Sequence, residues 1–223
     1  MVGLEIVGEN SIDTVKAICG PENPYNAKNE KPGSLRATFG KDPIKNAVHC
    51  SENAKASEHE RGLFFGSAAR VDCASAILSN CSLCLIKPHA FQDGKAGKII
   101  DKILEDGFEI SAMQTVFLDR AEAEEFFELY KGIHPAFHQM IDQCVCGPLI
   151  AIEVRQENVV QAFKRLCGPH DAEKAKAQSP QSIRALYGHD KVMNAVHCTD
   201  LESDAQLEVE FFFVILESRS RNE

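Results

Sequence analysis

The sequence of 223 residues is poor in basic side chains: 24 lysines and arginines stand against 33 aspartates and glutamates, for a net charge of −9. This balance argues against non-specific nucleic-acid binding, which depends on neutralising phosphates, although a few local cations would suffice for a small phosphate ligand. No apolar run is long enough to span a membrane, and the opening MVGLEIVGEN lacks the regions of a secretory signal. We therefore expect a cytoplasmic globular protein that binds neither nucleic acid nor membrane.

The sequence also lacks the signatures of a disulfide scaffold, a zinc site and a glycine-rich phosphate loop. Its nine cysteines are odd in number and several lie within apolar runs, so we expect reduced, mostly buried thiols. Cys144 and Cys146 are not followed by a second pair at zinc-finger spacing. Neither the dinucleotide-binding glycine motif nor the Walker lysine motif is present, which disfavours a doubly wound parallel sheet.

What is present is an internal repeat with an offset of 148 residues. The pentapeptide Asn46–Cys50 returns as Asn194–Cys198. Packing explains matched apolar positions but not matched charged and amide side chains, which at fixed spacing indicate a polar site. The alternative is common ancestry with little divergence. Loops 53–59 and 201–207 argue against it, because they share no residue when aligned at this offset. Further identical pairs are Glu5 and Glu153, Asn10 and Asn158, Lys16 and Lys164, Cys19–Pro21 and Cys167–Pro169, Arg36 and Arg184, and Glu60 and Glu208.

The two copies differ in length, because residues 80–147 have no counterpart in the first copy. We predict half of a first domain over residues 1–70, a linker over 71–79, a complete second domain over 80–217 and a tail over 218–223. We expect the missing half of the first domain to lie upstream in a longer natural protein.

Hydrophobic spacing in the second copy predicts alternating strands and helices. Strands are expected over 81–86, 108–118, 149–154 and 192–196, and helices over 95–105, 121–131, from Pro135 onwards and over 159–166. Residues 172–181 are expected to form a polar loop, and Asp200 to cap a last helix that carries Glu208. This order predicts an α+β, ferredoxin-like sandwich with a four-stranded antiparallel sheet flanked by helices.

Several short motifs resemble those of the nucleoside diphosphate kinase family. The resemblance spans residues 80 to about 215, and residues 1 to about 70 resemble the second half of such a domain. The tandem arrangement is similar to that of double-domain family members associated with cilia and microtubules. The motifs are Ile86–Ala90 (IKPHA), Gly147–Pro148 before an apolar strand, Gly168–Pro169, Ser182–Arg184, and Asn194–His197 with Glu208 eleven residues further on.

The resemblance implies a phosphotransferase that moves the terminal phosphate of a nucleoside triphosphate to a diphosphate through a phosphohistidine. It assigns the nucleophile to His197 and His49, and the carboxylate that orients it to Glu208 and Glu60. Mg²⁺ would enter with the phosphates of ATP or another nucleotide and would not be bound directly by the protein. The implied nucleotide-binding residues are Lys87, Lys164, Arg184 and Asn194, with Lys16, Arg36 and Asn46 in the first copy, and Phe137 or its neighbour Ala136 stacked on the base.

The sequence departs from the family pattern at positions that, by the resemblance, lie near the phosphate or the histidine. Each departure would weaken transition-state stabilisation, and several together would remove most turnover while leaving the fold intact. The first copy also lacks the strand that carries the lysine of the IKP motif, so it cannot form a complete pocket alone. The departures are Cys50 and Cys198 in place of glycine, Lys16 and Lys164 in place of arginine, Glu22 and His170 in place of threonine, and Phe127 in place of tyrosine.

Two functions therefore stay open. The first is an active nucleoside diphosphate kinase. The second is a catalytically weak or inactive kinase-derived structural protein of ciliary doublet microtubules, located in the axoneme with tubulin or other axonemal proteins as partners. The second rests on the resemblance alone. The remaining histidines, expected to be surface or packing residues, are His89, His134, His138 and His189.

Overall fold

The computed structural model describes residues 1–66 and 75–220, and the chain divides into two compact units, Met1–Cys73 and Ala74–Glu223. The second unit is built on one sheet of strands β1 (Cys81–Ile86), β2 (Glu109–Val116), β3 (Leu149–Arg155) and β4 (Val196–Cys198). The strand order is β2-β3-β1-β4, and every pairing is antiparallel. The predicted α+β fold with a four-stranded antiparallel sheet is confirmed.

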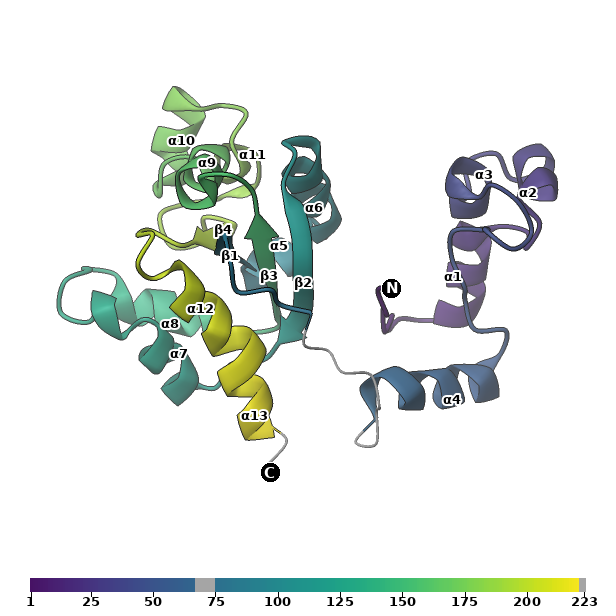
Figure 1. The fold of residues 1–223 in the computed structure, drawn as a ribbon, viewed down its shortest axis with the longest axis horizontal. Helices are drawn as coiled ribbons and strands as arrows, with labels where there is room; N and C mark the ends of the chain where they lie inside the picture. The colour runs from purple at the N-terminus through teal and green to yellow at the C-terminus, as the bar shows by residue number, and fades with distance from the viewer. Residues whose placement is uncertain (67–74, 221–223) are drawn as a thin grey trace. The chain divides into compact units, whose positions relative to one another are not determined.

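Helices cover both faces of this sheet because its central strands are apolar on both sides. Even-numbered residues of β1 and β3, such as Ile86 and Ile152, share a core with α6 (Ala96–Glu105) and α9 (Val159–Cys167). Odd-numbered residues, such as Leu85 and Leu149, share a second core. That core also receives α7 (Arg120–Phe126), α8 (Phe137–Val145) and α12 (Ala205–Glu210), and Figure 1 shows the resulting layers.

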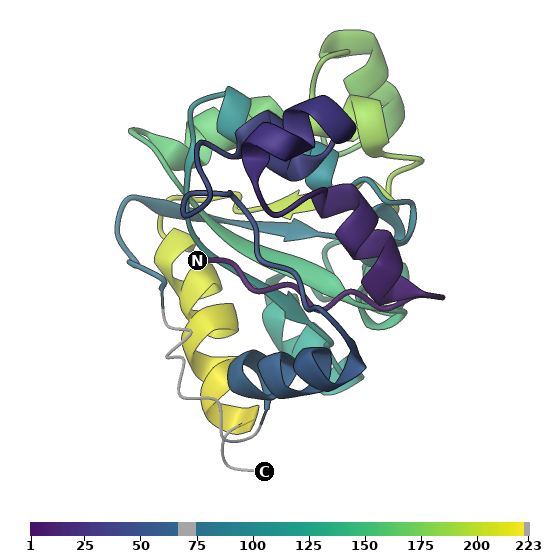
Figure 2. The same ribbon diagram turned by 90° about the vertical axis from the view of Figure 1, so that its right-hand side faces the viewer.

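Short helices connect these layers. Pro88 ends β1 and stands at the first position of α5 (Pro88–Gln92), where its missing N–H costs no hydrogen bond. A 3-10 turn, η1 (Glu128–Tyr130), follows α7, while α10 (Ala172–Gln178) and α11 (Ile183–Tyr187) lead from α9 to β4. At the C-terminal end α12, the π-helical η2 (Phe211–Ile215) and α13 (Leu216–Ser220) form one continuous rod, seen in yellow in Figures 1 and 2.

Three local predictions were wrong. Residues 172–178 form α10 and not a loop, because Asp171 caps them by accepting the N–H of Glu173 at 3.0 Å. The last strand begins at Val196 and not at 192, because Asp190 holds the N–H groups of Val192 and Met193 in a turn. The last helix begins after Asp204, since Asp200 is occupied elsewhere.

The first unit contains α1 (Ser11–Cys19), α2 (Pro24–Glu30), α3 (Leu35–Phe39) and α4 (Ala54–Phe65), and no strand within residues 1–66. With the offset of 148, α1, α2 and α3 have the same bounds as α9, α10 and α11. Residues 1–7 and 48–50, whose counterparts form β3 and β4, are not strands. Both β3 and β4 pair with β1, for which the first copy has no equivalent.

The predicted linker and tail lie partly outside the described residues, which omit 71–74 and 221–223. The end of the linker is tied to the second unit, because the N–H groups of Ile77 and Leu78 donate to the buried Glu153 carboxylate at 2.8 and 2.7 Å. Residues 218–220 continue α13. Within the described ranges, no helix combines the length and apolar character needed to cross a membrane.

Candidate functional site

A cavity of about 470 Å³ lies in the second unit beside His197. Four of the predicted site residues line it: Lys87, Lys164, Arg184 and His197. They come from the β1–α5 junction, α9, α11 and β4, so only the folded sheet and its helices bring them together. Asn194 and Glu208 do not line the cavity but contact residues that do.

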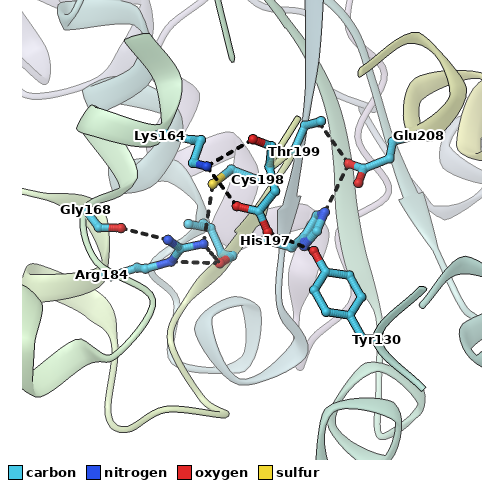
Figure 3. Close-up of polar contacts among 10 residues, drawn as sticks. Tyr130, Lys164, Gly168, Arg184, His197, Cys198, Thr199 and Glu208 are labelled. Carbon is cyan, nitrogen blue, oxygen red and sulfur yellow. Dashed lines mark hydrogen bonds and ion pairs between the residues drawn. The ribbon is translucent and has the colours of Figure 1, made fainter. Parts of the chain in front are cut away.

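His197 is held by a chain of hydrogen bonds shown in Figure 3. Its Nε2 lies 3.1 Å from Oε2 of Glu208, and the hydroxyl of Thr199 donates to the same oxygen at 2.8 Å. The N–H of Leu83 on β1 donates to the Thr199 hydroxyl at 3.0 Å, which directs that hydroxyl proton toward Glu208. The carboxylate is therefore fixed from two sides.

This arrangement selects one tautomer of the imidazole. An ionised carboxylate only accepts hydrogen bonds, so Nε2 carries the proton and Nδ1 carries the lone pair. Phe126 and Phe127 contact the imidazole edge-on, with ring centroids 5.4 and 5.5 Å away. Phe127 stands where the pattern described above has a tyrosine, so no hydroxyl is present there, and its ring packs beside the histidine.

Arg184 is buried and bound to the backbone around the histidine. Its Nη1 donates to the Gly168 carbonyl at 2.7 Å, and Nε and Nη2 donate to the Val196 carbonyl at 3.3 and 3.2 Å. Gly168 has a φ of 78°, and a Cβ at this position would overlap Oγ of Ser182. Arg184 thus joins the end of α9 to β4 while still lining the cavity.

Lys87 brings a buried positive charge to the same cavity. Its Nζ donates to the Val192 carbonyl at 2.9 Å. Burial is the main cause that lowers its pKa to about 8. Nearby, Asn194 donates to the His170 carbonyl at 2.9 Å, while its buried Oδ1 has no hydrogen-bond partner among the described residues.

Lys164 does not stand free in the cavity, because it pairs with Asp200. Its Nζ lies 3.1 Å from Oδ1 of Asp200 and donates to the Asp200 carbonyl at 3.0 Å. The Tyr130 hydroxyl donates to Oδ2 of Asp200 at 2.8 Å. Burial works to raise the pKa of Asp200, but the hydrogen bonds from Tyr130 and Lys164 outweigh it and hold that pKa low. Sequence reasoning missed both Tyr130 and Asp200 as cavity residues, although Asp200 directly follows the repeated motif.

Two of the remaining aromatic residues, Phe137 and His134, lie elsewhere than predicted. Phe137, expected to stack on a base, is only 4% exposed in the core and does not line the cavity, so its ring is not available there. His134, expected to be a surface or packing residue, does line it, together with His170. Burial, with Arg184 and Lys87 nearby, lowers the pKa of His170 to about 4. His89 is a packing residue, as expected, and its Nε2 accepts the N–H of Ala195 at 3.1 Å.

The family model for nucleoside diphosphate kinase matches residues 1–69 and 80–217. The chain belongs to the nucleoside diphosphate kinase family.

Two relatives show how the chain lies within this family. It is 43% identical to nucleoside diphosphate kinase homolog 7 of Rattus norvegicus over 98% of its own length, but spans only 55% of that relative. It is 34% identical to the nucleoside diphosphate kinase of Aquifex aeolicus over 61% of its own length and 95% of the relative. A crystal structure of the Aquifex aeolicus enzyme matches with a TM-score of 0.59 and 33% identity, over 62% of this chain and 97% of that one.

The family motif in the first unit has the same hydrogen bonds in more open surroundings. His49 Nε2 lies 3.0 Å from Oε1 of Glu60, and Ser51 donates to Oε2 at 2.6 Å. The hydrogen bonds from Ser51 and His49 lower the pKa of Glu60. A hollow beside His49 is lined by Asn46 and other residues of segment 39–49, but not by Arg36 or Lys16. Within residues 1–66, Arg36 still binds the Val48 carbonyl next to His49, but no counterpart of Lys87 is present.

Proposed function

We propose that the second unit transfers the terminal phosphate of a nucleoside triphosphate to a nucleoside diphosphate through a phosphohistidine at His197. The contact of Glu208 with Nε2 carries this proposal, because it leaves the Nδ1 lone pair available for attack. Lys87, Arg184 and Lys164 line the same cavity and would surround the transferred phosphate with positive charge.

In the first step Nδ1 of His197 attacks the γ-phosphorus, the bond from that phosphorus to the bridging oxygen breaks, and the diphosphate leaves. In the second step a terminal phosphate oxygen of another diphosphate attacks the phosphohistidine, and the N–P bond breaks. The imidazole gains positive charge in the first step, and Glu208, 3.1 Å from Nε2, stabilises it.

The lysines and the arginine that line the cavity fit the phosphates of a magnesium-bound nucleotide, and those phosphates would hold the metal. Among the described residues, no group of three or more His, Cys, Asp or Glu side chains could hold a metal ion. Mg²⁺ would neutralise phosphate charge when bound with the nucleotide. Asn194, which is buried and donates to the His170 carbonyl at 2.9 Å, would contribute by positioning the cavity wall around His170. Residues 80–217 would form this complete unit, and residues 1–70 the second half of a like domain.

The test is labelling with γ-³²P-ATP in the presence of Mg²⁺, followed by a chase with GDP. Acid-labile, alkali-stable label is expected on the protein and then in GTP. His197→Ala should abolish the label, while His49→Ala, the matched control, should leave it unchanged. A labelled His197→Ala protein, or an unlabelled wild type with a normal circular dichroism spectrum, would contradict the proposal.

A second candidate is a kinase-derived structural protein with weak or no turnover, and the Lys164–Asp200 pair favours it. This carboxylate neutralises one of the three cations and brings negative charge beside the phosphate site. The partner under this alternative is the ciliary doublet microtubule, through tubulin or another axonemal protein. Folded protein that takes no label but sediments with polymerised tubulin would support it.

A further inference from the structure

Two neighbouring thiols, Cys198 and Cys167, lie in the core beside His197, and phosphohistidine chemistry uses neither. Cys198 follows the histidine on β4, lines the cavity and is 3% exposed. Cys167 is the last residue of α9, which packs against β4, and it is fully buried. The two residues belong to one buried cluster, and each thiol shifts the pKa of the other. Cys198 is thus reached from the cavity, and Cys167 lies directly behind it.

The surroundings of Cys198 favour its thiolate. Arg184 donates from Nη2 to its sulfur at 3.4 Å. The thiol of Cys167, with the charges of Arg184 and His197, lowers the pKa of Cys198 to about 6 against the opposing effects of burial and Asp200. Lys87 also interacts electrostatically with Cys198. So does the thiol of Cys84 on β1, which lies opposite Cys198 in the pairing of β1 with β4. Burial raises the pKa of Cys167, so the pair divides into one thiolate and one thiol.

The first unit repeats this arrangement. Cys19 ends α1, Cys50 contributes to raising its pKa, and Arg36 Nη2 lies 3.8 Å from the Cys50 sulfur. Cys19, Arg36 and Cys50 are the counterparts of Cys167, Arg184 and Cys198 at the offset of 148. A thiol pair beside an arginine therefore occurs in both copies, together with the histidine motif.

We propose that Cys198 and Cys167 form a reversible oxidation site that reacts with hydrogen peroxide entering through the cavity. The Cys198 thiolate attacks one peroxide oxygen, the O–O bond breaks, and hydroxide leaves and takes up a proton. The product is a sulfenic acid on Cys198. The Cys167 thiol then attacks that sulfur, an S–S bond forms and water leaves, so that two thiols are oxidised while one peroxide is reduced.

The disulfide would alter the phosphate site, a consequence that rests on the proposed function. It removes the negative charge to which Arg184 donates and ties the residue next to His197 to the end of α9. Oxidation should then lower phosphohistidine labelling, and a dithiol reductant should restore it. The disulfide is detected by its mass, so this test gives a result whether or not the chain is an active kinase.

The experiment treats the full chain with a small excess of hydrogen peroxide and maps peptides by mass spectrometry with and without reductant. A Cys167–Cys198 linked peptide that the reductant cleaves is expected. In Cys167→Ser, Cys198 should stop at the sulfenic acid and react with dimedone. Cys146→Ser, which removes an exposed thiol outside the cavity, is the control and should leave the linkage unchanged.

A measurement on the unaltered chain keeps the proposal testable if a variant misfolds. The rate of Cys198 alkylation by iodoacetamide should reach half its maximum near pH 6. The proposal is overturned if Cys198 is linked to Cys84 instead of Cys167. It is also overturned if Cys198 stays reduced under peroxide or has the alkylation profile of an ordinary thiol.

Discussion

Arg36 in the first unit and Arg184 in the second bind equivalent backbone carbonyls at the same distances. Nη1 donates at 2.7 Å to Gly20 or Gly168, and Nη2 at 3.2 Å to Val48 or Val196. Gly20 and Gly168 share a φ of 78°, and α1–α3 repeat the bounds of α9–α11. Helices and their caps form from bonds within one stretch of chain, so half a domain suffices to build them.

The surroundings of the two copies differ. The His49 side chain is 77% exposed and that of His197 only 9%. Leu4 is 72% exposed within its unit, while its counterpart Ile152 on β3 is fully buried. The second unit has β1, β2 and the helices that cover them, and the first copy has no equivalent of these. Strands, burial and a closed cavity therefore depend on partners distant in sequence.

The largest expected effect comes from disrupting the glycine turn that follows α1 in the first copy and α9 in the second. Gly168→Ala would place a Cβ at positive φ and against Ser182, and we expect unfolding in urea to show a loss of about 4 kcal/mol. Gly94→Ala is the matched control, because Gly94 also has a positive φ but nothing within 4 Å of its Cβ. Its loss should be only about 1 kcal/mol. Equal losses at the two sites would show that the contact with Ser182 is unimportant.

A smaller effect is expected at Lys87, which has no counterpart in the first copy. Its folded pKa of about 8 lies below the ordinary lysine value of 10.5, so below pH 8 the folded state bears the full cost of the buried charge. That cost disappears as pH rises from 8 to 10.5. Lys87→Met should therefore raise the unfolding free energy at pH 7 by about 2–3 kcal/mol, after the lost hydrogen bond to Val192.

Denaturant unfolding over pH 7–10.5 measures this advantage of Lys87→Met, which should shrink toward the alkaline end. Lys98→Met is the control, since Lys98 is exposed on α6, and it should show no such trend. A Lys87→Met protein less stable than the wild type at pH 7 would contradict the prediction. Phosphohistidine formation in this variant should fall, because a phosphate-binding cation is lost.

The smallest effect separates the two histidine motifs. Glu208→Gln removes the charge that holds the proton on Nε2, and a glutamine that donates to Nε2 would shift the proton to Nδ1. We expect a loss of about 1.5–3 kcal/mol in transition-state stabilisation, roughly tenfold to a hundredfold in the rate of phosphohistidine formation. Glu60→Gln should leave that rate unchanged. Equal losses in rapid-quench measurements on the two variants would mean that the first copy contributes to activity.

Sequence reasoning found the sheet and four of the residues that line the cavity, because periodicity and motif spacing are local properties. It missed α10, which depends on the cap by Asp171, and misplaced the start of β4, which depends on the turn around Asp190. Asp200 and Tyr130 were missed as a pair because they are 70 residues apart and meet only across the cavity. Phe137 was misassigned because spacing does not tell a core ring from a cavity ring.

The sequence by itself determined the repeat, the family, most helices of the second copy and the histidine with its carboxylate, since these follow from patterns within short stretches of chain. Only the tertiary structure decided that Lys164 is neutralised by Asp200, that Lys87 is buried, and that Cys198 shares a core cluster with Cys167 and accepts a hydrogen bond from Arg184. These properties depend on distances between side chains far apart in sequence and on water excluded from between them, and packing alone sets both.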